Sequence, residues 1–276
     1  MRYAVILPGG TAPQQLERAA LAERSGWDGV FVWEAAYGVD AWALLAAIAT
    51  ATTRIRIGTL LTPLPWRRPW KVASQAATVD QLSQGRLILT VGLGALTSDL
   101  PLTGEATDLL QRAELLDEGI DLIQKLWAGE SHFEGRHYTY DGGTHSDQSQ
   151  VATPVQRPIP IWVVGVWPRP KSMARVLRCN GIVPQYDLAD REAEPDDARA
   201  VRAWLESRVG PEFDLTAEGE TPTEDQDGAQ AEVSRWADAG CSWWLETRWE
   251  MPHHSPERWQ KVRERLAAGP PTAGPN

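Results

Sequence analysis

The stretch that decides the fold is "RIRIGTLLTPLPWRRPWKVASQAATVDQLSQGRLILTVGLG", residues 54–94. It begins with "RIRIGT" and ends with "RLILTVGLG", two short apolar and β-branched runs that predict buried strands. Between them, Pro69 opens a segment in which apolar residues recur at helical spacing. Strand, helix and strand in this order predict a βαβ unit with parallel strands.

The same alternation continues on both sides of this unit. Further apolar runs predict six more strands, at residues 3–7, 29–34, 160–165, 181–186, 213–219 and 241–247. Helical patterns lie between these runs or after them, at residues 13–25, 40–51, 109–127, 190–208, 226–239 and 256–267. Eight strand–helix units over 276 residues average about 35 residues each, which predicts a single (β/α)8 TIM barrel of the usual ~250-residue size.

A doubly wound sheet is the competing α/β arrangement, but "LPGGTAP" after the first strand lacks its phosphate-binding fingerprint. The barrel domain is expected to cover residues 1–268, followed by a flexible tail at 269–276. Two insertions interrupt the alternation, 93–108 after the fourth strand and 131–158 before the fifth. Both are expected at or near the mouth, the end of the barrel where the carboxyl ends of the strands meet.

Composition narrows the class of protein. The net charge of −10 disfavours nucleic acid and anionic membranes as partners, since both attract clustered positive charge. Two cysteines imply no disulfide framework. The first apolar run is too short for a signal peptide, and no run approaches the ~20 apolar residues that span a bilayer. A cytoplasmic protein is therefore expected.

The predicted strand ends offer few acids and bases. All four lysines fall in predicted helices or at their starts, and no histidine falls on a strand, so neither a Schiff base nor a catalytic metal is expected. Glu34, at the end of the second strand, is the main titratable group. A catalytic role and a structural salt bridge both remain open for it, because a carboxylate at this place needs water or a partner. A site of flat, apolar walls favours chemistry that a cofactor carries.

Four segments, in order, carry a specific resemblance: "SGWDGVFVWE" (25–34), the quoted residues 54–94, "RAELLDEGIDLIQKLWAGESHFEGRHY" (112–138), and "RPIPIWVVGVWP" (157–168) with the following "NGIVP". Together the chain resembles the bacterial luciferase-like flavin-dependent oxidoreductases over roughly residues 1–268. The resemblance implies a (β/α)8 barrel that binds reduced FMN (FMNH2) or the deazaflavin F420. This fold agrees with the strand count.

The resemblance also implies particular site residues. The exit of the third strand in this family carries a non-prolyl cis peptide that supports the flavin ring. The matching bond is Thr59–Leu60, and we expect it there or one residue away. Gly92 and Gly94 match the end of the fourth strand, where small residues let a cofactor approach the backbone. A merely rigid loop is the alternative for the third-strand exit.

A second group of implied residues lies after the fifth strand. Gly165 and the segment through Ser172 match the region that takes the cofactor phosphate, with backbone N–H groups at the helix start, Ser172 and Arg169 as the anion site. For Arg169 the alternative is a solvated loop charge. The chain departs from many relatives at Ala35, where they carry a histidine, and this leaves Glu34 as the candidate catalytic residue.

The sequence therefore predicts a flavin-dependent oxidoreductase, preferably a monooxygenase that uses FMNH2 and O2 on a small organic substrate. A separate flavin reductase would supply the reduced flavin, and a homodimer is compatible with the resemblance. One alternative is F420-dependent hydride transfer, for which Arg67 and Arg68 offer cations to an anionic tail although the net charge opposes it. Another is a flavin-binding barrel without catalytic activity.

Overall fold

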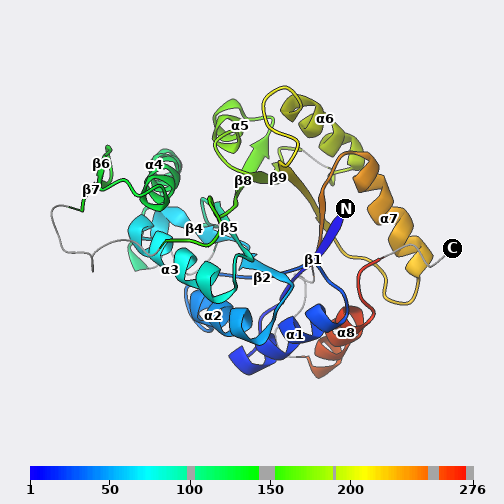
Figure 1. Cartoon of the computed structure of the whole chain (residues 1–276). Coiled ribbons are helices and arrows are strands. Elements are labelled where there is room, and N and C mark those ends of the chain that lie inside the picture. Colours follow the sequence, from blue (N-terminus) through cyan, green and yellow to red (C-terminus); the bar gives the residue numbers. More distant parts are fainter. Residues whose placement is uncertain (98–102, 143–152, 189–190, 248–254, 272–276) are drawn as a thin grey trace.

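The computed structural model describes residues 1–97, 103–142, 153–188, 191–247 and 255–271. Eight parallel strands form a closed barrel with helices around it (Figure 1). The barrel strands are β1 (Arg2–Ile6), β2 (Gly29–Val32), β3 (Arg56–Thr59), β5 (Leu87–Gly92), β8 (Ile161–Trp167), β9 (Gly181–Tyr186), β10 (Asp214–Gly219) and β11 (Trp243–Glu246). They follow the order β3-β2-β1-β11-β10-β9-β8-β5, and pairing of β3 with β5 closes the ring. The predicted barrel and its eight strands are confirmed.

The helices follow the strands in alternation. They are α1 (Ala12–Arg24), α2 (Ala41–Ala51), α3 (Pro69–Leu82), α4 (Leu109–Trp127), α5 (Pro170–Val176), α6 (Pro195–Leu205), α7 (Gln226–Asp238) and α8 (Pro256–Ala267). Asp40 and Asp108 cap α2 and α4, each accepting a backbone N–H with its side chain, as short polar side chains do at helix starts. The helix expected at 190–208 is shorter, because Pro195 occupies its first turn.

Side chains on the strands alternate between two apolar layers. One layer lies between the strands and the helices. The other fills the lumen of the barrel with Phe31, Trp162, Trp243 and smaller apolar residues. Gly58 makes room there, since a Cβ atom would lie 2.8 Å from the ring of Phe31. The alternation therefore tells which strand residues face the lumen.

A short corner joins β3 to α3. It consists of β4 (Thr62–Pro63), which pairs with β5, and the 3-10 helix η1 (Leu64–Trp66). Trp66 is nearly buried, and its indole N–H donates to the carbonyl of Ala106 at 2.8 Å. This corner places Arg67 and Arg68 directly before α3 and beside the mouth.

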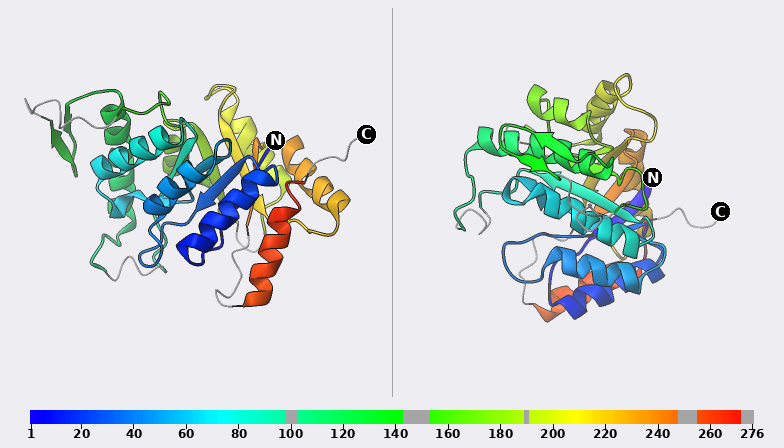
Figure 2. Two further views of the ribbon diagram at one scale, coloured as in Figure 1. Left: turned by 60° about the horizontal axis from the view of Figure 1, so that its bottom comes forward. Right: turned by 60° about the vertical axis from the view of Figure 1, so that its left-hand side comes forward.

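The insertion before β8 has two parts in different places. Its hairpin, β6 (His132–Glu134) and β7 (Thr139–Asp141), lies outside α4 (Figure 2), and Tyr138 reaches Trp70 in the first turn of α3. Residues 153–156 instead lie at the opposite end of the barrel, where the backbone N–H of Gln156 donates to buried Asp80. The expectation that residues 131–158 lie at the mouth is wrong for this second part, because the chain must return there to enter β8.

The chain ends beside its beginning. α8 packs beside α1 (Figures 1 and 2), and the indole of Trp27 donates to the carbonyl of Leu266. Residues 269–271 of the expected tail continue from α8, and 272–276 lie outside the described residues. Among the described helices, none is long and apolar enough to cross a bilayer.

Candidate active site

The eight residues predicted from the sequence lie at the mouth ends of β2, β3, β5 and β8 or just after them. These four strands are consecutive in the barrel. The structure therefore brings the predicted residues to one half of the mouth. The other half, formed by β9, β10, β11 and β1, contains none of them.

Glu34 is held in a polar cluster. Its Oε2 accepts hydrogen bonds from the hydroxyl of Thr62 at 2.6 Å and the indole N–H of Trp42 at 3.1 Å. Its Oε1 pairs with the guanidinium of Arg67, which also donates to Gln75. The Glu34 side chain is 6% exposed. Both oxygens are occupied, so the geometry resembles a structural ion pair.

Burial raises the pKa of Glu34, although Arg67, Thr62 and Trp42 each act to lower it. Desolvation of the carboxylate is the larger effect. The ionised form therefore depends on its three partners.

The cis peptide joins Leu60 and Leu61, one residue after Thr59–Leu60 and within the expected range. The side chain of Leu60 belongs to the lumen, so the bond lies at the inner wall of the mouth. Thr59 is fully buried, and its hydroxyl donates to the carbonyl of Thr90. Its hydroxyl oxygen lies 3.0 Å from that of Thr62, which connects the cis bond to the Glu34 cluster.

Gly92 and Gly94 serve packing at the end of β5. A Cβ atom at Gly92 would lie 2.8 Å from Leu61, and one at Gly94 would collide with the ring of Trp66. Gly94 also has φ +78, a conformation that favours glycine. The guanidinium of Arg112 donates to its carbonyl at 2.9 Å. These glycines allow close approach of neighbouring side chains, and their role in letting a cofactor approach the backbone stays a prediction.

Gly165 also faces protein. A Cβ atom there would lie 2.8 Å from both Ile182 and Val176, which belong to β9 and α5. Its missing side chain thus lets α5 pack on β8. The side-chain direction at Gly165 points away from the lumen, and a role of this position in binding a phosphate stays a prediction.

The other two residues of the predicted phosphate region have protein partners. The hydroxyl oxygen of Ser172 accepts the backbone N–H of Val166 at 2.9 Å. Arg169 is exposed and pairs with Asp187 at 2.9 Å, which raises the pKa of its guanidinium. A role for these residues in binding a phosphate stays a prediction.

Glu218 is a carboxylate that the sequence argument missed. It pairs in register with Leu245, a lumen residue, so it faces the lumen at the mouth end of β10. Among the described residues it has no hydrogen bond or ion pair. Burial raises its pKa even though solvent reaches the side chain, as expected for a group within the barrel wall. The alternation in "FDLTAEG", residues 213–219, could have indicated it, since polar residues there alternate with apolar ones.

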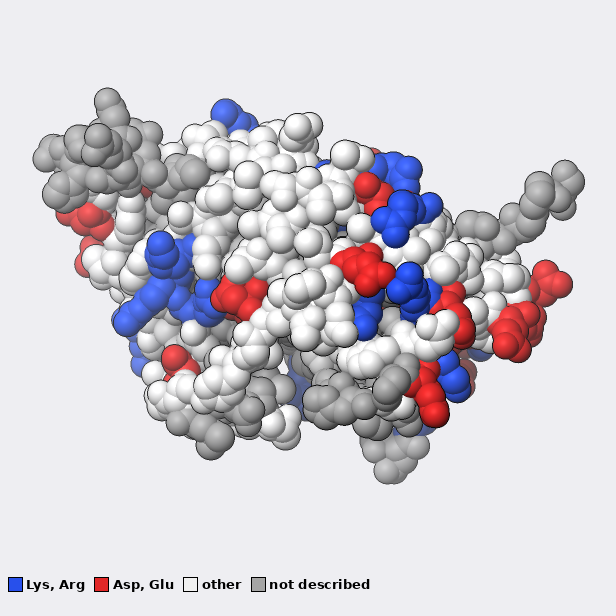
Figure 3. All heavy atoms as spheres, turned by 90° about the horizontal axis from the view of Figure 1, so that it is seen from below, with Lys and Arg blue, Asp and Glu red and all other residues white. Residues whose placement is uncertain are grey.

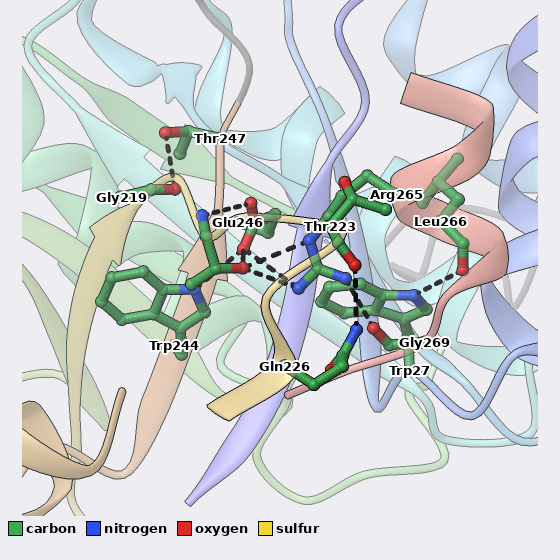
Figure 4. Close-up of polar contacts among 11 residues, drawn as sticks. Trp27, Gly219, Thr223, Gln226, Trp244, Glu246, Thr247, Arg265, Leu266 and Gly269 are labelled. Carbon is green, nitrogen blue, oxygen red and sulfur yellow. Dashed lines mark hydrogen bonds and ion pairs between the residues drawn. The ribbon is translucent and has the colours of Figure 1, made fainter. Parts of the chain in front are cut away.

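Glu246, on the neighbouring strand, is the opposite case. It faces away from the lumen and is fully buried (Figure 4). It accepts from the backbone and hydroxyl of Thr221 at 2.8 and 2.7 Å, and from the indole of Trp244 at 3.1 Å. Arg265 of α8 approaches it to 3.5 Å. This cluster fastens α8 to the barrel.

A cationic hollow of about 630 Å³ lies at the rim of the mouth. Its cations are Arg67, Arg68 and Lys71, from the end of the corner and the first turn of α3. The rest of the wall includes the acidic Glu105 as well as Trp66, Gln75, Gln111, His137 and Tyr138. Figure 3 shows positive side chains grouped on the α3 side of this face. The hollow is a local positive surface on an acidic protein.

Other chemistries find little support. The four lysines lie on α3, α4, α5 and α8, as predicted, and none lies in the lumen. No group of three potential metal ligands comes together in the part of the chain that the structure describes. His145, His253 and His254 fall outside the described residues.

A profile of the family described as luciferase-like monooxygenase matches residues 4–272. The chain belongs to this family. The predicted resemblance is confirmed, and the protein is a luciferase-like oxidoreductase.

Relatives within the family use either cofactor. The chain is 30% identical over 293 residues to an F420-dependent glucose-6-phosphate dehydrogenase of Beutenbergia cavernae, covering 91% of this chain and 83% of that protein. It is 27% identical over 187 residues to the oxygenase component of a flavin-dependent trigonelline monooxygenase of Acinetobacter baylyi. The second match covers 66% of this chain and 51% of that protein, so the chain spans about half of that relative's length.

Solved structures agree with the fold. An F420-dependent secondary alcohol dehydrogenase, in complex with an F420–acetone adduct, has a TM-score of 0.76 at 17% identity and covers 97% of this chain and 96% of that one. The oxygenating constituent of 3,6-diketocamphane monooxygenase of Pseudomonas putida, in complex with FMN, has a TM-score of 0.55 at 19% identity, covering 87% and 62%. At these identities the similarity shows the barrel alone.

Proposed function

We propose that the protein is an F420-dependent oxidoreductase that moves a hydride between a small organic substrate and the deazaflavin. The cationic hollow carries this proposal: Arg68 and Lys71 are its exposed cations, and Arg67 lines it while paired with Glu34. F420 ends in an acidic tail, and cations along its path would stabilise it through charge-assisted contacts. FMN ends in one compact phosphate, which needs no such hollow.

This proposal departs from the preference for FMN that the sequence suggested. The net charge of −10 is a property of the whole chain, whereas a ligand responds to charges within about a Debye length, ~10 Å at 0.1 M salt. The local positive charge of the hollow therefore matters more for binding this ligand than the net charge of the whole chain. The match to an F420-dependent dehydrogenase over 91% of this chain supports the same reading.

The inner wall of the mouth fits a flat ring. Trp33, Leu60 and Val164 face the lumen there, and Trp33 and Val164 are partly exposed. When bound, the deazaflavin supplies a ring carbon that accepts or returns a hydride. The part of this chain would be to hold the ring against the apolar wall, orient the substrate and keep water away.

The second candidate is an FMN-dependent monooxygenase served by a separate flavin reductase. The same apolar wall favours it, because oxygen chemistry on a reduced flavin also needs a dry pocket. The similarity to the trigonelline monooxygenase supports it over a smaller part of the chain.

Calorimetric titration with F420 and with FMN separates the two candidates. Lys71→Ala and Arg68→Ala remove exposed cations of the hollow, and Lys261→Ala, an exposed lysine on α8, is the matched control. The proposal expects F420 to bind wild type more tightly than FMN does. It expects each hollow variant to weaken F420 by about two- to fivefold at low salt and less at high salt. Tighter binding of FMN, with no effect of either variant, would favour the second candidate.

A further inference from the structure

The position of Glu218 is shared by no other carboxylate on the described strands. Leu215 and Ala217 pack between strands and helices, so Thr216 and Glu218 face the lumen. Glu218 lies at the mouth end of β10, whereas Asp214 lies at the opposite end of that strand. A carboxylate here meets whatever enters the mouth.

Glu218 is also free to react. Glu34 and Glu246 have both of their carboxylate oxygens in hydrogen bonds or ion pairs. Within the described chain, Glu218 has neither kind of partner. A carboxylate without partners gains nothing for the fold from its charge, and Glu218 is exposed at the mouth. Its carboxylate is therefore available to whatever enters the mouth.

The surroundings of Glu218 are polar but uncharged. Leu245 lies opposite Glu218 on β11. On the other side, β9 pairs with the start of β10 at Gly181 and Asp214, and Gln185 and Glu218 are each four residues further along their strands. Below Glu218, the hydroxyl of Thr216 is buried and lacks a hydrogen-bond partner among the described residues. The charge of Glu218 acts on Tyr186, which faces the outer layer and whose pKa is raised mainly by burial. Gln185, Thr216 and Glu218 can therefore form hydrogen bonds with a substrate hydroxyl or a water.

We propose that Glu218 is a catalytic residue that exchanges a proton with the substrate. In the oxidation of a secondary alcohol, the C–H electron pair leaves the carbinol carbon as a hydride for the oxidised deazaflavin. The O–H bond breaks, its proton moves to the carboxylate of Glu218, and the C=O bond forms. In the reverse direction, reduction of a ketone, the hydride returns to the carbonyl carbon and the proton of Glu218 moves to the oxygen. This inference rests on the proposed F420-dependent function.

Desolvation by the surrounding barrel wall raises the pKa of Glu218 from the usual value of a glutamate. A general base and acid works best when its pKa lies near the working pH. The environment of the residue therefore agrees with proton exchange in both directions.

The test compares wild type with Glu218→Gln, which keeps the shape and removes the proton-transferring group. Glu224→Gln, an exposed glutamate in the loop after β10, is the matched control. F420 affinity is measured by calorimetry for all three proteins. In protein labelled with carbon-13 at the glutamate carboxyl, the resonance that Glu218→Gln lacks is followed against pH. It is then followed as acetone is added to the F420 complex.

We expect F420 to bind all three proteins equally. The Glu218 resonance should titrate above the ordinary range and shift when acetone binds, and hydride transfer from 2-propanol should slow by about 10²–10⁴-fold in Glu218→Gln alone. The inference would be overturned if the Glu218 resonance did not shift when acetone is added. An unchanged rate of hydride transfer from 2-propanol in Glu218→Gln would also overturn it. Loss of F420 affinity in that variant would also overturn it, by making Glu218 a cofactor-binding residue. Failure of wild type to bind F420 would instead remove the proposed function.

Discussion

Glu218 and Glu246 lie on neighbouring strands at nearly the same height in the barrel, since Gly219 pairs in register with Glu246. Glu246 faces the helices and is fully buried among Thr221, Trp244 and Arg265. Glu218 faces the lumen and, in the described chain, has no partner. A one-residue difference in register therefore separates a structural carboxylate from one available for chemistry.

The contrast extends to the whole mouth. On the β2–β8 half, the polar side chains of Glu34, Ser172 and Arg169 all contact protein groups. The β9–β11 half presents Gln185 and Glu218 without such contacts in the described residues. Partners thus distinguish polar groups that hold the barrel together from those that can meet a ligand, such as Glu218 on one half and Arg68 and Lys71 at the rim of the other.

The largest effect is expected from breaking the Glu246 cluster. Arg265→Ala would leave Glu246 buried without its cation, and this should lower the free energy of unfolding by about 3–5 kcal/mol. Arg265 also lies over the ring of Trp27 and donates to the carbonyl of Gly269, so α8 should loosen. Denaturant unfolding measures the loss. Arg263→Ala, in an exposed pair with Glu17, is the control and should cost at most about 1 kcal/mol.

A loss of less than about 1 kcal/mol in Arg265→Ala would mean that burial of a partnered carboxylate does not mark a structural role here. The comparison between Glu246 and Glu218 would then lose its basis.

An intermediate effect is expected at Glu34. Arg67→Ala removes the cation that offsets the desolvation of this carboxylate. The free energy of unfolding at pH 7 should therefore fall by about 1–3 kcal/mol. The pKa of Glu34 is already raised and should rise further in the variant. A raised folded-state pKa favours the folded state below the unfolded pKa, and that advantage is lost as pH rises. The variant should therefore approach wild type in acid.

Unfolding curves at several pH values test this dependence, with Arg68→Ala as the neighbouring control. A difference between Arg67→Ala and wild type that stays constant with pH would show that Glu34 does not need Arg67 for its charge.

The smallest effect on stability is expected at Glu218. Its pKa is raised by burial with no partner to oppose it, so wild type loses stability as pH rises through that value. Glu218→Gln does not titrate and should equal or exceed wild type in stability above this pKa. The difference should shrink below the unfolded pKa of about 4.3, where both side chains are neutral. Thermal unfolding across this range measures it. A clear destabilisation by Glu218→Gln at pH 7 would assign the residue to the fold.

The local pattern of apolar residues in the sequence was sufficient to predict most of the strands and helices. The alternation of apolar runs with helical spacing placed all eight strands, and the spacing in residues 109–127 placed α4 to the residue. Such periodicity is visible in sequence because each element must bury one face or both. The family resemblance placed the cis peptide within one residue of Leu60–Leu61.

The site depended on tertiary structure. Glu34 looked like the available acid, but Trp42 of α2 and Thr62 and Arg67 of the corner after β3 bind it. Pairing of β2 with β3 brings this corner beside Glu34. The sequence matched Gly165 to a phosphate-binding region, and only the fold shows that its missing side chain makes room for Ile182 and Val176. The sequence by itself determined which residues are strand and helix, because periodicity is a local property. Only the fold decided which carboxylate is left without a partner, because partners meet through contacts between residues far apart in the chain.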